Sequence, residues 1–174
     1  MDHSAKGRLK LASLTPIFES YDRSGVIEIK VIRDRETVFI GLYERSALII
    51  TEKTLDLLSK EELQAVVAHE LAHELFWDEY RLAREGGQDD KVQEIDLRCD
   101  GLAVFVLARL GLEPTRLISA LHKTARYDRD TWGANYYAAS DERVAFARAM
   151  IELVKNDNWV RPTSAGAVAD LASR

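Results

Sequence analysis

The sequence is poor in the residues that usually mark disulfide frameworks, flexible linkers and membrane segments. It has one cysteine, three prolines and nine glycines in 174 residues. Cys99 has no second cysteine to pair with, so the fold does not depend on an internal disulfide. The longest apolar run, residues 101–108, is far too short to span a bilayer. There is no long basic stretch, and the net charge of −5 argues against nucleic acid or an anionic membrane surface as a partner.

The composition that remains is that of a globular domain. Apolar residues make up 47% and charged residues 30% of a chain whose length suits a single domain with its own core. No apolar segment typical of a signal peptide precedes Pro16, so we expect a cytoplasmic protein without a membrane segment. We divide the single domain into a lead-in (about 1–24), a sheet region (25–58), a helical region (59–155) and a polar tail (156–174).

The pattern of apolar residues predicts an α+β fold, with a small three-stranded sheet packed on a mainly helical domain. Runs of β-branched residues separated by charged turns predict strands at residues 26–32, 37–43 and 47–51. Helical periodicity, capping residues and the Gly and Pro positions predict helices over 54–58, from 60 for about 16 residues, and over 90–110, 114–125 and 141–155. Residues 127–139 are aromatic and are predicted to be irregular.

The second of these helices carries the most informative motif, His-Glu-Leu-Ala-His at residues 69–73. Residues four apart lie on one face of a helix, so His69 and His73 can bind a single metal ion. Glu70 is then placed to take a proton from water on that ion. Ser59 and Glu62 form a predicted capping box at the start of the helix. Two histidines and a glutamate on an apolar helix need such a role to offset their desolvation.

A catalytic zinc ion usually has a third protein ligand, and the acids of the next long helix are the candidates. Helical periodicity places Asp96 and Asp100 beside the apolar stripe of that helix, and Glu94 on the opposite, solvated face. We therefore predict Asp96 as the third ligand and Asp100 as the acceptor that orients a ligating imidazole. Glu94 remains the alternative ligand. Glu74, which follows the motif, is expected to be solvated or paired with arginine.

The chain resembles the gluzincin metallopeptidases of the HtpX and CAAX prenyl endopeptidase type. Residues 49–73 are similar to that family's strand, its Leu-Leu-Ser-x-Glu-Glu-Leu turn and its Val-x-Ala-His-Glu-x-x-His helix. Asp-Leu-Arg-Cys-Asp at 96–100 resembles the family's Glu-x-x-Ala-Asp element, and Asp-Glu-Arg-Val at 141–144 resembles the region after its His-Pro. The resemblance extends over residues 37–153.

Two departures from the family pattern matter. The third-ligand position holds Asp96 where the family has glutamate, and Ala-Ala-Ser at 138–140 stands where the family has His-Pro. A histidine that would stabilise the oxyanion is therefore missing. Tyr137, Tyr136 or Arg143 would have to take its place, although each also has an ordinary structural interpretation.

The resemblance implies a zinc endopeptidase in which His69, His73 and Asp96 bind Zn²⁺ and Glu70 is the general base. Asp100 would hold a ligating histidine, and Tyr137 or Arg143 would act on the oxyanion. The substrate would be a protein or peptide in extended conformation, bound along the strand near residues 39–43. The alternative function is a regulatory metal-binding module that retains the motif but cleaves nothing, or only one partner.

Overall fold

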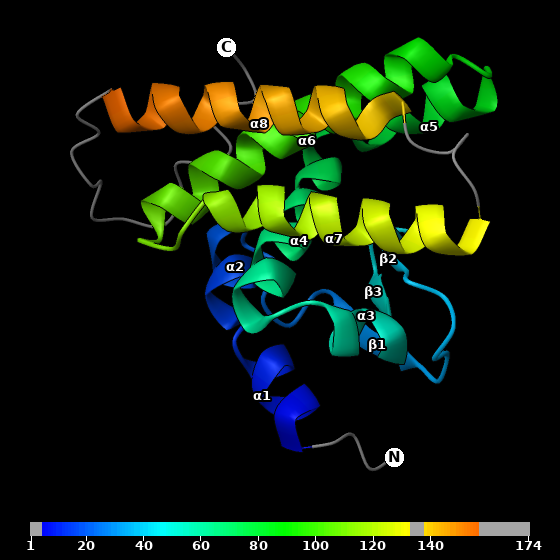
Figure 1. Cartoon of the computed structure of the whole chain (residues 1–174), viewed down its shortest axis with the longest axis vertical. Coiled ribbons are helices and arrows are strands. Elements are labelled where there is room, and N and C mark those ends of the chain that lie inside the picture. Colours follow the sequence, from blue (N-terminus) through cyan, green and yellow to red (C-terminus); the bar gives the residue numbers. More distant parts are fainter. Residues whose placement is uncertain (1–4, 133–137, 157–174) are drawn as a thin grey trace.

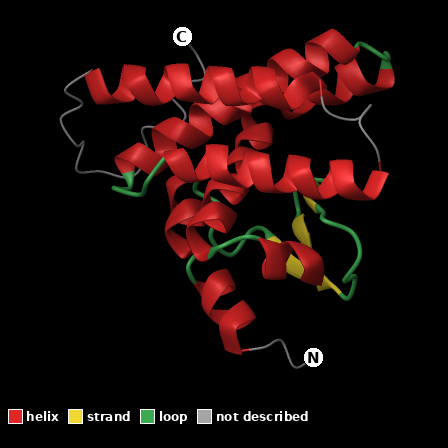
Figure 2. Ribbon diagram, viewed as in Figure 1, coloured by secondary structure: helices red, strands yellow, loops and turns green. Residues whose placement is uncertain are grey.

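The computed structural model describes residues 5–132 and 138–156, and it confirms the predicted α+β class. Helices dominate, and the strands gather at one end of the molecule (Figures 1 and 2). In chain order the elements are α1 (Ala5–Ala12), α2 (Thr15–Ser20), β1 (Glu28–Ile32), β2 (Ile40–Tyr43), β3 (Ala47–Thr51), α3 (Glu52–Leu57), α4 (Lys60–Ala72), the 3₁₀ helix η1 (His73–Phe76), α5 (Trp77–Glu85), α6 (Asp89–Arg109), α7 (Thr115–Trp132) and α8 (Ala138–Asn156).

The three predicted strands form one mixed sheet in the order β1-β3-β2. The most apolar strand, β3, lies in the centre, where it pairs in parallel with β1 and antiparallel with β2. The turn between β2 and β3 has positive φ at Glu44 (44°) and Arg45 (56°), as a tight hairpin requires. Because β2 pairs only with β3, its other edge has no partner strand among the described elements.

The helices build the core around α4. This helix packs against α6 and α7, and both of these pack against α8 (Figure 1). The main core joins the inner side of α4 to the sheet, and its fully buried members include Leu48, Ile50, Leu63, Val67 and Leu71. The helix that carries the motif is therefore packed between the sheet and the helices α6 and α7.

The helix with the His-Glu-x-x-His motif ends earlier than its pattern suggests. No Gly or Pro interrupts residues 60–80, but the α-helix stops at Ala72 and continues as the 3₁₀ helix His73–Phe76 before α5 begins. Tightening into 3₁₀ geometry is common at helix ends. Here the buried side chains of His73, Glu74 and Phe76 all take tertiary contacts, which override local propensity.

The prediction of an irregular segment from residue 127 was wrong in part, because α7 runs on to Trp132. No Gly or Pro stands between Pro114 and Gly133, so nothing in the chain stops the helix earlier. Tyr127 fixes this extension, since its hydroxyl donates to the Glu36 carbonyl and the Lys53 ammonium lies 4.8 Å from its ring centroid. The predicted tail from 157 onward lies outside the described residues.

The predicted capping box at α4 is present. The Ser59 hydroxyl accepts from the Glu62 amide at 3.2 Å, and the Glu62 carboxylate accepts from the Ser59 amide at 2.7 Å. Glu62 is almost fully buried and also accepts from Ser119 and, at 2.7 Å, from Lys123 of α7. The start of the motif helix is thereby tied to α7.

Replacing the cap should destabilise the protein measurably. We expect Ser59→Ala to lower the free energy of unfolding by about 1 kcal/mol, because one amide of the first turn loses its acceptor. Urea unfolding followed by circular dichroism measures this, with the exposed neighbour Lys60→Ala as control. Equal stability of the two variants would contradict the role of the cap.

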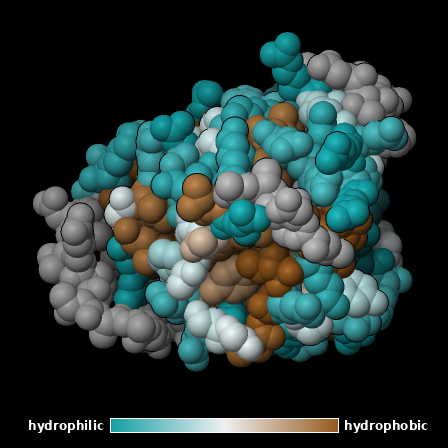
Figure 3. All heavy atoms as spheres, turned by 90° about the horizontal axis from the view of Figure 1, so that it is seen from below, coloured by the Kyte–Doolittle hydropathy of each residue, from teal (hydrophilic) through white to brown (hydrophobic). Residues whose placement is uncertain are grey.

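The surface of the described residues mixes charged and apolar side chains. The face over α1, α3 and the sheet carries apolar areas between hydrophilic ones (Figure 3). Within residues 5–132 and 138–156, no helix combines the length and hydrophobicity needed to cross a membrane.

Candidate metal centre

The last turn of α4 and the start of η1 present the three motif residues to the interior. His69 and His73 are buried, and their rings meet edge to face with centroids 5.0 Å apart. Glu70, which lies between them in the sequence, is partly buried. The capping box sets the start of α4, and its regular α-helical turns carry His69 and His73 to the same side.

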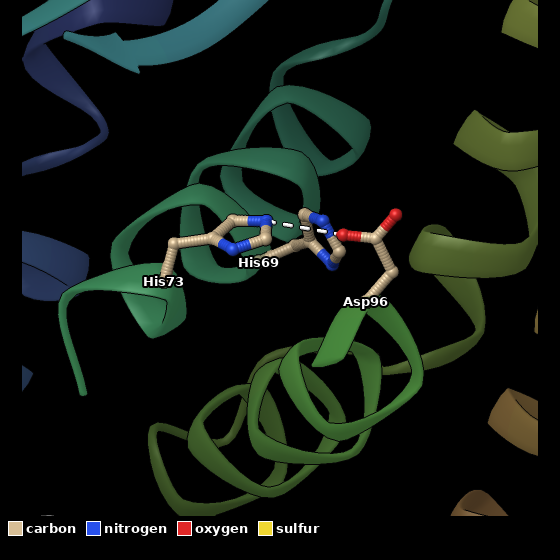
Figure 4. Close-up of side chains that lie close together, drawn as sticks. All are labelled: His69, His73 and Asp96. Atoms are coloured by element: carbon tan, nitrogen blue, oxygen red, sulfur yellow. Dashed lines mark ion pairs between the residues drawn. The ribbon is translucent and has the colours of Figure 1, made fainter. Parts of the chain in front are cut away.

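The third member of the cluster comes from α6, far from the motif in sequence. Asp96 points toward both imidazoles (Figure 4), and its Oδ1 lies 3.4 Å from Nε2 of His73. One potential ligand atom from each of His69, His73 and Asp96 lies within 4.8 Å of the others. Glu94 lies elsewhere: its side chain is 55% exposed and pairs with Lys91 at 2.9 Å.

This donor set fits a zinc ion. Ligand atoms about 2.0–2.1 Å from a tetrahedral zinc are separated by about 3.3–3.4 Å, and the pair His73–Asp96 stands at 3.4 Å. The ligand atoms of the whole cluster lie within 4.8 Å of one another, so the more distant pairs would have to draw together on binding. Two imidazoles with one carboxylate, rather than an all-oxygen set, favour zinc over magnesium or calcium.

The electrostatics of the cluster also suit a bound cation. Burial, with the nearby charges of His69 and Arg143, lowers the pKa of His73 to about 3, so this ring is neutral and can donate a lone pair. Burial raises the pKa of Asp96 and of Glu70, because their charged forms lose water. A dication beside these carboxylates would offset that desolvation. Among the described buried side chains, His73 Nδ1 is the polar atom left without a hydrogen-bond partner.

Asp100 and Arg143 form a buried network against His69. Asp100 is fully buried and its Oδ1 lies 2.8 Å from Nδ1 of His69. Arg143, from α8, binds both Asp100 oxygens at 2.8 Å through Nε and Nη2. Burial alone would raise the pKa of Asp100, but the charge of His69 and the hydrogen bonds from Arg143 and His69 lower it to about 2. Asp100 therefore stays ionised and holds the His69 ring in place.

Arg143 also contacts the His69 ring directly. Its Nη2 lies 3.3 Å from Nδ1 and 3.4 Å from Nε2 of that ring. The guanidinium therefore packs directly against the imidazole and adds to the contacts that hold this ring.

A cavity of about 190 Å³, lined by both apolar and charged side chains, opens beside the motif. Glu70, His69 and Arg143 line one part of it, and Val66 with Leu117 of α7 contributes to its apolar wall. The backbone amide of Leu42 in β2 lies close enough to the Glu70 carboxylate to lower its pKa against the effect of burial. Glu70 therefore lies where the cavity, the metal cluster and the edge strand meet.

The structure reveals one neighbour of the cluster that the sequence did not identify, and it decides between the two expectations for Glu74. Tyr80 of α5 packs its ring edge to face on His73, with centroids 4.8 Å apart. Glu74 is buried and paired with Arg23 and Arg45, so its solvated alternative is excluded. No short-range pattern marks either contact, because the partners lie far apart in the chain. The predicted oxyanion candidate Tyr137 lies outside the described residues, as does Tyr136.

Comparison with known protein families identifies part of the chain. The sequence profile of Peptidase family M48 matches residues 19–86, a segment that contains β1, β2, β3 and the whole His-Glu-x-x-His motif. The predicted resemblance to this type of metallopeptidase is confirmed for that segment. Asp96, Asp100 and Arg143 lie beyond the match, so their placement rests on the structure. No curated protein matches the chain.

Proposed function

Because the profile of Peptidase family M48 matches residues 19–86, we propose that the chain is a zinc-dependent endopeptidase with Glu70 as general base. Metallopeptidase activity in general follows from the family, whose members depend on a metal ion that is usually zinc. The observation that supports the specific site is the convergence of His69, His73 and Asp96 beside Glu70. The alternative, a regulatory module that does not cleave peptides, is not favoured by the match.

In this proposal His69, His73 and Asp96 bind the zinc ion. When bound, zinc lowers the pKa of a coordinated water and polarises the scissile carbonyl. Asp100 accepts from Nδ1 of His69 and so keeps Nε2 as the free donor atom of that ring. The lowered pKa of His73 keeps its ring neutral for the same purpose.

Glu70 is the residue that transfers protons during hydrolysis. Its carboxylate accepts a proton from the attacking water and passes it to the nitrogen of the leaving amine. Burial raises the pKa of Glu70, which makes the carboxylate a stronger base than an exposed glutamate.

The guanidinium of Arg143 is our candidate for stabilising the oxyanion. It lines the cavity next to Glu70 and keeps its charge because Asp100 holds both Nε and Nη2. A fixed positive charge in a largely water-excluded site is effective against developing negative charge. Tyr137 remains a predicted second donor.

The substrate in this proposal is a peptide segment in extended conformation. The edge of β2 that has no partner strand offers backbone groups for pairing with such a segment, as in β-augmentation. Phe39 and Tyr43 beside this edge are exposed, at 49% and 56%. The cavity beside Glu70 would receive an apolar side chain next to the scissile bond.

The third ligand provides the direct test of the metal site. Asp96→Ala should weaken zinc binding by more than about 100-fold, a loss beyond that caused by removing an outer-shell partner. The matched control Glu94→Ala, on the same helix but exposed, should bind zinc like the wild type. Elemental analysis and chelator competition measure zinc, and hydrolysis of unfolded casein measures activity. Zinc loss in Glu94→Ala instead would contradict the assigned ligand, and a zinc-loaded wild type that cleaves no peptide would contradict the proposed function.

A further inference from the structure

The residue directly after the second motif histidine is a buried carboxylate with two arginine partners. The Glu74 side chain is only 3% exposed. Its Oε2 lies 3.0 Å from Nη2 of Arg23 and 3.1 Å from Nε of Arg45. A buried carboxylate needs such partners to offset its desolvation, so the three charges hold one another in place.

These two arginines come from segments on either side of β1 and β2. Arg23 lies between α2 and β1, and Arg45 is the middle one of the three residues, 44–46, that connect β2 to β3. The turn is tight, with left-handed backbone at Glu44 and Arg45. A tight turn has few alternative conformations. The ion pair between Arg45 and Glu74 therefore fixes the position of the whole hairpin relative to Glu74.

The same hairpin meets the motif a second time, through its backbone. The register pairs Gly41 with Ile49 and Tyr43 with Ala47, and the Thr51 amide donates to the Phe39 carbonyl. In an antiparallel pair the backbone groups of alternate residues face the partner strand, so those of Leu42 face the edge without a partner strand. There the Leu42 amide meets the Glu70 carboxylate.

From these contacts we propose that Glu74 is a positioning residue that fixes the β2 edge relative to Glu70. Glu74 holds the hairpin through Arg45, and the hairpin holds the Leu42 amide against Glu70. A peptide bound along β2 would then be presented at a set distance from the general base and the metal cluster. The inference rests on the proposed function for its consequence in catalysis, but the clamp itself is a property of the folded protein.

Amide exchange provides a test that does not require activity. In Glu74→Gln, which keeps the shape but removes the charge, exchange of the Leu42 amide measured by NMR should accelerate by about tenfold. The amides of Gly41 and Tyr43, which pair with β3, should keep their protection. The matched control is Glu79→Gln on α5, which also loses a carboxylate bound by two cations, Lys91 and Arg98, but does not contact the hairpin.

Kinetics separate positioning from a purely structural role. In zinc-loaded Glu74→Gln the KM for unfolded casein should rise by about tenfold with little change in kcat, because binding along the strand is weakened. Glu79→Gln should keep the wild-type KM. If the wild type has no peptidase activity, the proposed function fails while the exchange experiment still decides the clamp.

A Leu42 amide that exchanges at the wild-type rate in Glu74→Gln would overturn the inference. So would an equal acceleration in Glu79→Gln. If Glu74→Gln does not fold, Arg45→Met removes the hairpin partner at a half-exposed position and should give the same selective loss of Leu42 protection. Unchanged Leu42 exchange in Arg45→Met would then be equally decisive against it.

Discussion

Glu70→Gln is expected to lower kcat for peptide hydrolysis by about 10²–10⁴-fold, the usual contribution of a general base. The amide keeps the size of the side chain but cannot take a proton from water. Because Glu70 is not among the three clustered ligand residues, zinc content should stay at the wild-type level. The measurement is kcat on a peptide library or unfolded casein, alongside elemental analysis of the same sample.

The control for this variant is Glu61→Gln, which changes a half-exposed glutamate on the same helix. It should leave kcat, KM and zinc content unchanged. Hydrolysis that persists in zinc-loaded Glu70→Gln would rule out Glu70 as general base. A wild type that holds zinc but cleaves nothing, like the variant, would instead support the regulatory alternative.

The largest effect on stability is expected for Asp100→Ala. This side chain is fully buried and accepts from His69 and from two nitrogens of Arg143, all at 2.8 Å. Its removal leaves the Arg143 guanidinium and the His69 N–H without their acceptor. Breaking a buried charge pair on one side typically costs about 3–5 kcal/mol. Urea unfolding should show a loss of this size, and zinc affinity should fall by about 10–100-fold.

A double-mutant cycle tests whether the network is the cause. Asp100→Ala combined with Arg143→Met should cost less than the sum of the two single changes, because no charge is then left unpaired. Additive costs would contradict the pairing.

The stability of the fold should depend on pH through Asp100. The pKa of Asp100 in the folded protein is about 2, which lies below the ordinary 3.8. The ionised form of Asp100 therefore stabilises the fold above about pH 4, and this contribution is lost as the pH falls toward 2.

Some parts of the fold could be predicted because their causes lie within a few residues. The capping box at Ser59, the 47–51 strand and the long helix α6 all follow from short-range hydrogen bonding and periodic side chains. The spacing of His69 and His73 belongs to the same class, since one helical turn brings both rings to one side. Periodicity on α6 also separated the inward Asp96 from the outward Glu94.

Other parts depended on packing between distant segments. The α-helix α4 ends at Ala72 although no Gly or Pro stands there, so tertiary contacts decide where it ends. The order of the strands places β2 at an edge of the sheet, and this order could not be predicted from local sequence patterns.

For the candidate site, the sequence by itself determined the motif helix and the short list of acids from which a third ligand could come. Only the tertiary structure brings Asp96 within reach of the imidazoles, pairs Arg143 with Asp100, and pairs Glu74 with Arg45 of the hairpin. The physical reason is the separation along the chain over which each interaction acts. Backbone hydrogen bonds and helical periodicity act over a few residues and can be read along the chain. Ion pairs such as Asp100–Arg143 join residues 43 positions apart and exist only once the helices have packed.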